Sequence, residues 1–416
     1  MSKNSLLCTR REFLKASSLL AIGTAMPGFL ARSVAANTAP GALIPGFKDD
    51  RILVVVQLGG GNDGLNTVVP YNNDIYYSSR PNIALQKRDI LRINDDIGLH
   101  PRMGGIKELV DSGKMSIIEG VGYPNPNRSH FRSMEIMQTA TDSERFTDTG
   151  WLGRYLDNAC GGEAEPVAGL AMGSERPQAF DGKKGFGIAL EDPDSFGWTD
   201  GVGEAKEQNF REINEAYRPQ NDTLDFLRKV TANAVLSSDR VKEVSRKYKG
   251  GVSYPGDAFG TGLRTIAKMI AGNLPTRIYY VTLGGFDTHV NQLGAHANLM
   301  DRFTRGITAF QKDLELQGNA DRVLTLTFSE FGRRVEENAS NGTDHGTAAP
   351  MFLIGKNVKP GLAGKRPDLT NLDNGDLRFT TDFRSVYASL LENWLGAPSQ
   401  TVLGGKFNPV DIVKMA

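Results

Sequence analysis

The sequence predicts one α/β domain with a mostly parallel central sheet and helices on both faces of that sheet. Continuous apolar runs rich in β-branched residues occur at residues 52–58, 277–283 and 323–328, as in strands that are buried on both faces. A segment with helical apolar spacing at 296–316 separates two of these runs. Glycine is abundant, with 47 of 416 residues, and often follows an apolar run directly, as tight strand-to-helix turns require. Strands that alternate with helices are typical of this fold class.

Each element follows from its local pattern. Apolar runs predict strands at residues 52–58, 115–121, 167–172, 277–283, 323–328 and 350–354. Helices are predicted at residues 100–113, 129–139, 261–271, 296–316 and 382–395. The stretch at 204–250 is charged and poor in glycine, so we expect long helices inserted into the domain there. Such an insertion serves either as a lid over a site or as a cover for one face of the sheet.

Residues 1–36 have the pattern of a twin-arginine signal peptide. Arg10 and Arg11 precede a short apolar run and then a stretch of small residues. The apolar run is shorter than the roughly 20 residues that span a bilayer, and we expect no membrane span elsewhere. Residues 37–47 form a linker, and residues 48–416 the mature domain. The sequence therefore predicts export through the twin-arginine machinery to the periplasm or the cell exterior.

The composition excludes some classes of partner and bond. Lys and Arg together number 48, as do Asp and Glu, so no overall field draws the protein to nucleic acid or an anionic membrane. Of the two cysteines, Cys8 lies in the signal peptide and Cys160 stands alone, so no intramolecular disulfide is expected. The sequence does not indicate an oligomeric state.

Potential metal ligands stand where predicted strands meet loops. Asp63 follows the first strand, Asp287 and His289 follow the strand at 277–283, and Glu330 follows the strand at 323–328; His345 precedes the last strand. We expect Glu330 and His345 to lie at the same edge of a parallel sheet, where open α/β sheets bind ligands. Three carboxylates and two imidazoles suit one or two divalent cations, namely zinc, manganese, calcium or magnesium.

Several of these residues also have a purely structural interpretation. Asp63, in an Asn-Asp-Gly turn, is alternatively a turn residue, and Asp287 and His289 are alternatively partners in loop hydrogen bonds. A structural role is harder to find for Glu330, because an unpaired carboxylate at a strand end is costly. Asp344 is expected to orient the ring of its neighbour His345.

Residues near the start of the helix at 129–139 are candidates for catalysis and substrate binding. Ser129 either caps this helix or directs its hydroxyl toward an anion site, and the two roles are compatible. His130 is a supporting or general-acid group. Arg128 and Arg333 are candidates to bind an anionic substrate, with exposed arginines as the alternative. His100 and His296 are expected to be structural.

Six motifs together resemble the bacterial domain of unknown function 1501 family over nearly the whole mature chain. These are the twin-arginine start, LGGGNDGLNTVVPY, NRSHFRSMEIMQTA, GGFDTHVNQ, FSEFGRR and NGTDHGTAAPMFLIG. That family resembles, more distantly, the alkaline phosphatase and sulfatase superfamily, which implies an alkaline phosphatase-like sheet.

The resemblance also implies roles for individual residues. Asp63 would be the first-strand ligand and Ser129 the nucleophile. Asp287, His289 and His345 would hold one metal, and Glu330 would hold a second. The chain departs from the superfamily at Phe331, where a histidine is common, and in the tighter spacing of Asp287 and His289. Ser133 is a rival nucleophile.

The resemblance thus implies an exported metal-dependent hydrolase of small phosphate or sulfate esters. The alternative is a non-catalytic periplasmic binding or assembly protein that retains the hydrolase fold.

Overall fold

The computed structural model describes residues 47, 49–159, 166–183, 187–191, 241, 243–244, 248 and 250–414. The predicted signal peptide, the linker apart from Phe47, and most of the insertion at 204–250 lie outside this part of the chain. The chain divides into two compact units, Met1–Ala42 with Pro193–Glu243, and Leu43–Asp192 with Val244–Ala416. The second unit carries the sheet and every site discussed below.

The described strands and helices account for all the elements predicted outside the insertion, with shifted bounds. The strands are β1 Ile52–Gly59, β2 Val68–Val69, β3 Leu91–Arg92, β4 Gly98–Leu99, β5 Met115–Gly122, β6 Gly169–Met172, β7 Ile188–Leu190, β8 Ile278–Gly284, β9 Val323–Phe328, β10 Ala349–Ile354, β11 Gly361–Gly364, β12 Leu372–Asp373, β13 Asp376–Leu377 and β14 Thr381–Asp382. The α-helices are α3 Gly64–Thr67, α4 Asp74–Ser78, α5 Gly104–Asp111, α6 His130–Thr139, α7 Trp151–Ala159, α10 Ala258–Ala271, α11 Gln292–Leu316, α12 Phe383–Asn393 and α13 Ser399–Leu403. Short 3-10 turns lie at Pro166–Ala168, Gln178–Phe180 and Ala320–Arg322.

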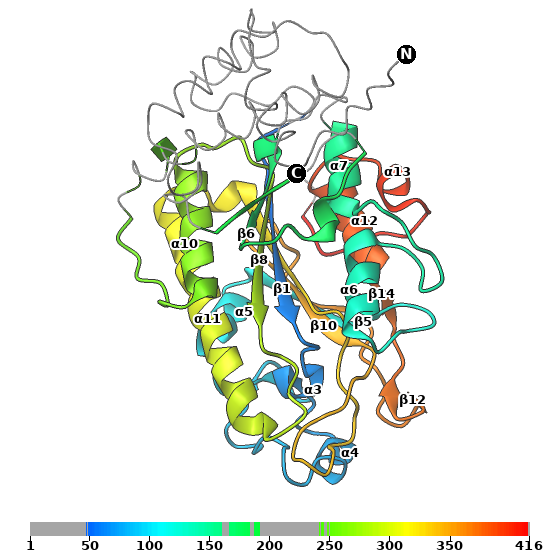
Figure 1. Ribbon diagram of the computed structural model, residues 1–416. Helices are drawn as coiled ribbons and strands as arrows, with labels where there is room; N and C mark the ends of the chain where they lie inside the picture. The colour runs from blue at the N-terminus through cyan, green and yellow to red at the C-terminus, as the bar shows by residue number, and fades with distance from the viewer. Residues whose placement is uncertain are drawn as a thin grey trace, which may run out of the picture. The chain divides into compact units, whose positions relative to one another are not determined.

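Nine of the described strands form one mixed, mostly parallel sheet, which confirms the predicted fold class (Figure 1). Its order is β11-β5-β10-β9-β1-β8-β6-β7, with β14 also paired to β5. β1 lies at the centre and pairs in parallel with β8 on one side and β9 on the other. β10 is antiparallel to both of its neighbours, β5 and β9.

The direction of β10 corrects one step of the sequence interpretation. In a purely parallel sheet, the end of one strand and the start of the next lie at opposite edges. Glu330 and His345 meet at one edge because β10 turns back along β9. The two residues therefore lie at the same edge of the sheet, but through an antiparallel strand.

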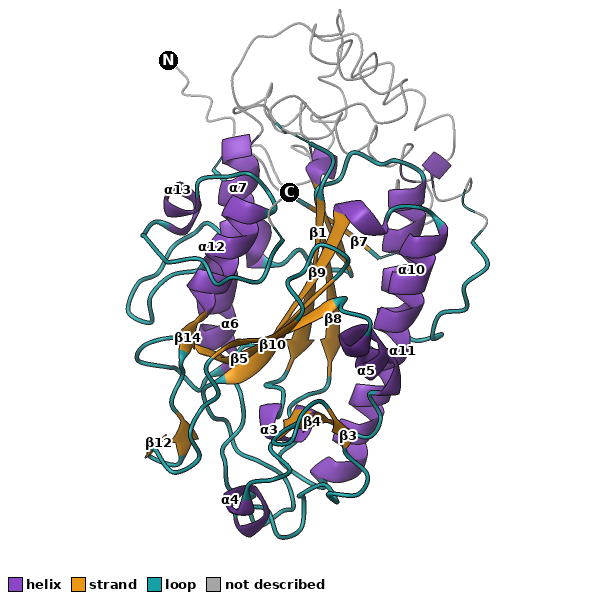
Figure 2. Ribbon diagram, turned by 180° about the vertical axis from the view of Figure 1, so that it is seen from behind, coloured by secondary structure: helices purple, strands orange, loops and turns teal. Residues whose placement is uncertain are grey.

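Helices pack on both faces of this sheet (Figures 1 and 2). Leu53 and Val55 of β1 pack in a core with residues of α6, α7 and α12. The alternate residues Ile52, Val54 and Val56 are just as buried and point to the opposite face, because successive side chains of a strand alternate. On that side α10 and α11 pack together, and α5 packs on α11. No helix in the described ranges is long and apolar enough to cross a membrane.

Two glycines shape the loop after β1. Gly60 has φ of 119°, and a Cβ there would lie 2.4 Å from the backbone nitrogen of Asp287. Gly61 has φ of 80°, and a Cβ there would lie 2.3 Å from the ring of Phe331. Glycine adopts this backbone region freely and leaves room for close approach. The glycine-rich turn thus lets the loops after β1, β8 and β9 come together at one edge of the sheet.

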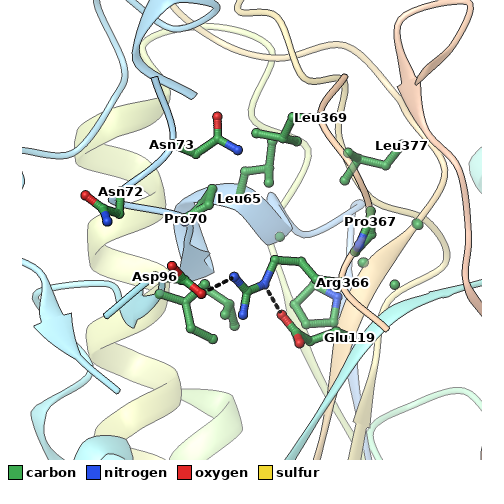
Figure 3. A pocket seen from close by; sticks show the side chains of 17 residues that line it. Leu65, Pro70, Asn72, Asn73, Asp96, Glu119, Arg366, Pro367, Leu369 and Leu377 are labelled. Atoms are coloured by element: carbon green, nitrogen blue, oxygen red, sulfur yellow. Dashed lines mark hydrogen bonds and ion pairs between the residues drawn. The ribbon is translucent and has the colours of Figure 1, made fainter. Parts of the chain in front are cut away.

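A cavity of about 160 Å³ lies beside α3 and the start of β10 (Figure 3). Its walls come from α3 and β2, from β5, from the start of β10 and from the segment at 366–377.

Candidate metal centre

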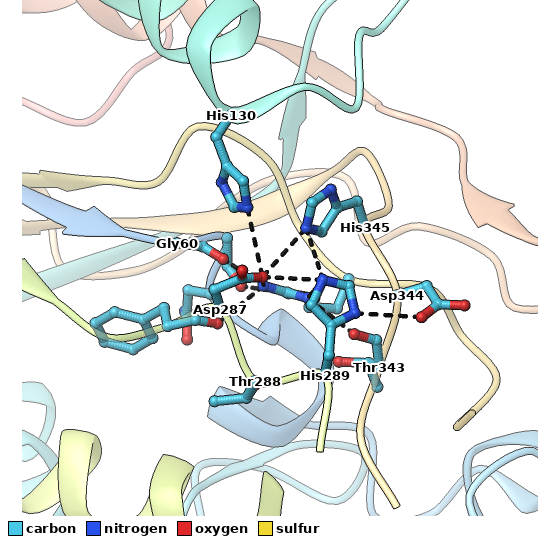
Figure 4. Close-up of polar contacts among 12 residues, drawn as sticks. Gly60, His130, Asp287, Thr288, His289, Thr343, Asp344 and His345 are labelled. Atoms are coloured by element: carbon cyan, nitrogen blue, oxygen red, sulfur yellow. Dashed lines mark hydrogen bonds and ion pairs between the residues drawn. The ribbon is translucent and has the colours of Figure 1, made fainter. Parts of the chain in front are cut away.

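The carboxylate of Asp287 lies at the centre of a cluster of histidines (Figure 4). Its Oδ1 is 3.0 Å from Nε2 of His289, 3.2 Å from Nε2 of His345 and 3.4 Å from Nε2 of His130. The Nε2 atoms of His289 and His345 are 2.9 Å apart. Three of the five histidines of the sequence therefore direct the same ring nitrogen at one carboxylate oxygen.

The other ring nitrogen of each histidine lies beside an acceptor. Nδ1 of His130 is 2.9 Å from Oε1 of Glu330. Nδ1 of His345 is 2.8 Å from the backbone carbonyl of Arg128, and Nδ1 of His289 is 3.3 Å from Oδ1 of Asp344. A neutral ring that carries its proton on Nδ1 donates it to this acceptor, and its Nε2 is then free to bind a cation. The Nε2 lone pairs then face one another, an arrangement that a shared cation or a shared proton stabilises.

The spacing of these atoms fits a metal ion. Ligand atoms bound about 2.0–2.2 Å from one zinc ion lie roughly 3.0–3.5 Å from each other. The contacts of Asp287 with the three imidazoles have this length, and the potential ligand atoms of His130, Asp287 and His345 all lie within 4.8 Å of one another. Nε2 of His130 is buried and has no hydrogen-bond partner among the described residues. The donor set therefore suits a divalent cation that prefers nitrogen and carboxylate ligands.

Arg333 holds Asp287 from behind. Its guanidinium is buried, and Nη2 donates to Oδ1 of Asp287 at 2.7 Å. Nε donates to the carbonyl of Gly61 at 2.7 Å, and Nη1 to that of Thr343 at 2.8 Å. Burial raises the pKa of Asp287, but the hydrogen bond from Arg333 and the neighbouring histidines outweigh it and lower the pKa to about 2. Arg333, a predicted substrate-binding residue, therefore positions an ionised carboxylate and already has protein partners on all three of its nitrogens.

Two carboxylates have partners other than those expected. Oε1 of Glu330 accepts hydrogen bonds from His130 and from the backbone N–H of Gly60, at 2.8 Å. Glu330 thus lies behind His130 and orients it, as outer carboxylates commonly orient metal-binding histidines. It does not join the cluster around Asp287, contrary to expectation. Asp344 faces His289 instead of its sequence neighbour His345.

Asp63, a predicted metal ligand, lies outside the cluster and pairs with an arginine. Its Oδ2 accepts a hydrogen bond from Nη1 of Arg80 at 2.6 Å, and both side chains are 0% exposed. Its Oδ1 caps α3 by accepting from the backbone N–H groups of Leu65 and Asn66. Burial alone would raise the pKa of Asp63. The charge and hydrogen bond of Arg80 more than offset this effect, so the pKa lies below its usual value and the carboxylate stays ionised. Both oxygens are therefore already bound by the protein.

Gln292 connects this buried pair to the loops that carry two of the histidines. Its side-chain amide donates to Oδ2 of Asp63, and its carbonyl accepts from the hydroxyls of Thr288 at 3.0 Å and Thr343 at 2.6 Å. Thr288 directly precedes His289, and Thr343 lies two residues before His345. The first residue of α11 thus fastens both histidine loops to the loop after β1.

The predicted nucleophiles differ in accessibility. Ser129 is exposed at the N-cap of α6, directly before His130, and its side chain makes no capping hydrogen bond. Ser133 is fully buried, with its hydroxyl 3.0 Å from that of Tyr123. The guanidinium of Arg128 pairs with the buried carboxylate of Asp376. Ser129 is therefore the accessible hydroxyl of the two serines, and Arg128 already has an anionic partner.

The family model described as "Protein of unknown function (DUF1501)" matches residues 119–382, more than half of the chain. The chain belongs to this family. No curated protein sequence matches it.

Solved structures similar to the DUF1501 chain include a protein in the alkaline phosphatase superfamily from Vibrio parahaemolyticus, at 9% identity over 92% of this chain and 79% of that one, with a TM-score of 0.40. The PsFucS1 sulfatase from Pseudoalteromonas sp. has 10% identity over 87% and 70% of the two chains, with a TM-score of 0.37. The lipoteichoic acid synthase LtaP from Listeria monocytogenes has 11% identity over 76% and 69%, with a TM-score of 0.35. At such identities and TM-scores, the chemistry of the DUF1501 chain has to be derived from its own residues.

Arg80 and Gln292 are the two supporting residues that the sequence interpretation missed. Arg80 lies in an irregular stretch after α4, and no periodic pattern marks it as buried. The apolar spacing predicts the long helix only from His296, whereas α11 begins at Gln292. The motif GGFDTHVNQ, which ends on Gln292, was the one available signal.

We expect the stability of the DUF1501 chain to fall in acid, because its two remaining histidines, His100 and His296, are buried. His296 is completely buried beside His100, and burial lowers its pKa to about 4. An unfolded chain takes up this proton near pH 6.5, so the unfolded form binds more protons between pH 6.5 and 4. Stability should fall as the pH drops through that window, by about 3 kcal/mol for this one group, and should not depend on it above pH 6.5.

Urea unfolding at pH 7, 6 and 5 measures this loss, with His296→Gln as the matched variant. The glutamine amide retains a donor toward Oδ1 of Asn62, which lies 3.1 Å from Nε2 of His296. We expect a flatter dependence of the unfolding free energy on pH in the variant. Equal slopes in both proteins would show that another group causes the acid sensitivity.

Proposed function

We propose that this DUF1501 protein is an exported, metal-dependent hydrolase of phosphate or sulfate esters. The observation that supports it best is the convergence of three histidine Nε2 atoms on Oδ1 of Asp287. In this proposal His130, Asp287, His289 and His345 are the metal ligands. Three imidazoles and one carboxylate favour zinc or manganese over calcium and magnesium, which prefer oxygen ligands.

The exposure of the cluster supports a catalytic site over a structural one. The side chain of Asp287 is 49% exposed, and the three histidines are partly exposed. Structural zinc sites are closed, whereas catalytic sites keep a position open for water or substrate. A cation held by these residues would supply a Lewis acid, which lowers the pKa of a nearby hydroxyl and draws charge from an ester oxygen.

Ser129 is the proposed nucleophile. Its exposed hydroxyl lies at the N-terminus of α6, one residue before His130, where the first backbone N–H groups of a helix favour an anion. The hydroxyl oxygen bonds to phosphorus or sulfur, and the ester oxygen leaves as an alcohol that carries the serine proton, delivered through solvent. Water then releases phosphate or sulfate and regenerates the serine.

Apolar side chains that follow the histidines in the sequence indicate the chemical nature of the alcohol part of the ester. Phe131, which follows His130, is 91% exposed, and Val290, which follows His289, is also exposed. Leu293 is exposed one turn further on. Exposed apolar side chains that follow site residues in the sequence are candidates to contact an apolar part of a substrate. We therefore propose substrates whose alcohol part is aromatic or aliphatic.

One observation favours the alternative, a non-catalytic exported binding or assembly protein. Arg128 and Arg333, the predicted anion-binding groups, both have protein partners. Recognition of an anionic ester then depends on the metal and the N-terminus of α6.

Replacing Ser129 by alanine tests the hydrolase directly. With aryl phosphates and aryl sulfates as substrates, we expect Ser129→Ala to lower kcat by about a thousandfold or more, as nucleophile removal does in serine hydrolases. Zinc affinity, measured by calorimetry, should not change. Ser133→Ala is the control, and it should affect thermal stability more than kcat. Undiminished turnover in Ser129→Ala would rule out this mechanism.

A further inference from the structure

The cavity of about 160 Å³ is distinct from the candidate metal centre (Figure 3). None of the residues that line it is His130, Asp287, His289, His345 or Glu330. Most of its wall is apolar and buried, formed by Leu65, Val68, Ile97, Leu369 and Leu377 together with three prolines. An apolar cavity of roughly 150 Å³ in another protein binds benzene, so this space accommodates one six-membered ring.

A buried carboxylate stands at one end of the cavity. Glu119 occupies the middle of β5, where all eight residues are buried. A charge in such a strand requires a partner. Nε of Arg366 donates to Oε1 of Glu119 at 2.8 Å, and Figure 3 shows the guanidinium between Glu119 and Asp96. The pair neutralises Glu119 and fixes the guanidinium at the cavity wall.

The outer edge of this guanidinium lacks a strong partner. Asp96 is the other nearby carboxylate, 3.8 Å from Nη1 and beyond hydrogen-bond distance, and its side chain is 69% exposed. Among the described residues, Arg366 donates one hydrogen bond, through Nε. The two terminal nitrogens therefore remain available in the fork geometry that matches a carboxylate.

We propose that this cavity binds a small aromatic or branched aliphatic carboxylic acid. The ring or alkyl body contacts Leu65, Leu369 and Leu377, and the carboxylate takes the place of Asp96 on the terminal nitrogens of Arg366. A cationic ligand is disfavoured, because Glu119 is already paired and any cation near it would lie beside the guanidinium. This site does not depend on the hydrolase proposal.

Three ligands of similar size and different charge distinguish recognition of the ligand's carboxylate from recognition of its ring. Benzoate, benzyl alcohol and benzylamine are titrated into the full-length protein, and the methyl resonances of Leu65, Leu369 and Leu377 are followed by NMR. We expect benzoate to bind with a Kd on the order of 1 mM, as a fragment of this size permits, and at least tenfold more tightly than the other two. Equal binding of benzoate and benzyl alcohol, tighter binding of benzylamine, or no binding at all would each overturn the proposal.

Variants of Arg366 show whether the guanidinium recognises the acid. Arg366→Met should weaken benzoate binding at least tenfold and leave benzyl alcohol unaffected. Because this change leaves Glu119 unpaired, Arg366→Lys is the second variant; it retains the charge but not the fork, and should give intermediate affinity. Benzoate affinity that is unchanged in Arg366→Lys and in a folded Arg366→Met would contradict the assignment. Zinc affinity at the metal centre serves as the control and should not change in either variant.

Discussion

Replacing Asp287 by asparagine is expected to lower the affinity of the protein for Zn²⁺ by about a thousandfold or more. Asparagine has the same shape and still accepts from Arg333, but it lacks the negative charge toward which the three imidazoles converge. Loss of a partner behind a metal ligand typically costs 10- to 100-fold in affinity, and loss of a charged ligand should cost more. Because asparagine keeps the hydrogen bond to the buried Arg333, the variant should fold.

Competition titration with a chelator measures this affinity, and Asp344→Asn is the matched control. Asp344 contacts only the far nitrogen of His289 within the cluster, so its loss should cost between ten and a hundredfold. Circular dichroism establishes that both variants are folded. If Asp287→Asn bound zinc as tightly as the unchanged protein, Asp287 would not be a ligand, and the histidines would be an exposed hydrogen-bonded group.

The loop positions of three candidate ligands could be predicted from the sequence, because the end of a strand is visible in the local pattern of apolar residues and glycines. Asp287 and His289 follow β8, and His345 precedes β10, so the junction of these loops was foreseeable from apolar runs and glycines. The direction of β10 was not, because a six-residue apolar run has the same pattern in either orientation. The role of His130 also depends on packing, since only the fold places its Nδ1 against Glu330.

Asp63 shows that a position after a strand does not by itself identify a metal ligand. It lies after the first strand, where a metal ligand was expected, yet its partner Arg80 comes from an irregular stretch 17 residues later. No periodicity marks such a pairing, and the same carboxylate suits a metal or a guanidinium. The choice between them depends on which cation the fold brings to it.

Removing Arg80 should therefore destabilise the protein more than any other single arginine substitution proposed here. Its guanidinium pairs with Asp63 in a fully buried site and also donates to the backbone carbonyls of Arg334 and Val335, both at 2.8 Å. Arg80→Met leaves a buried carboxylate without its cation, which typically costs 3–5 kcal/mol. Arg88, whose side chain is 84% exposed, provides the control, and Arg88→Met should cost less than about 0.5 kcal/mol.

The double variant Asp63→Asn with Arg80→Met distinguishes the charge from the packing. If the unpaired carboxylate causes the loss, the double variant should be more stable than Arg80→Met alone, because the asparagine is neutral and its side-chain oxygen can still cap α3. Urea unfolding measures the free energy of unfolding of the unchanged protein, Arg80→Met, Arg88→Met and the double variant. The backbone contacts of Arg80 lie next to Arg333, which holds Asp287, so folded Arg80→Met should also bind zinc more weakly. Unchanged zinc affinity in that variant would mean that the buried pair stabilises the fold without positioning the metal centre.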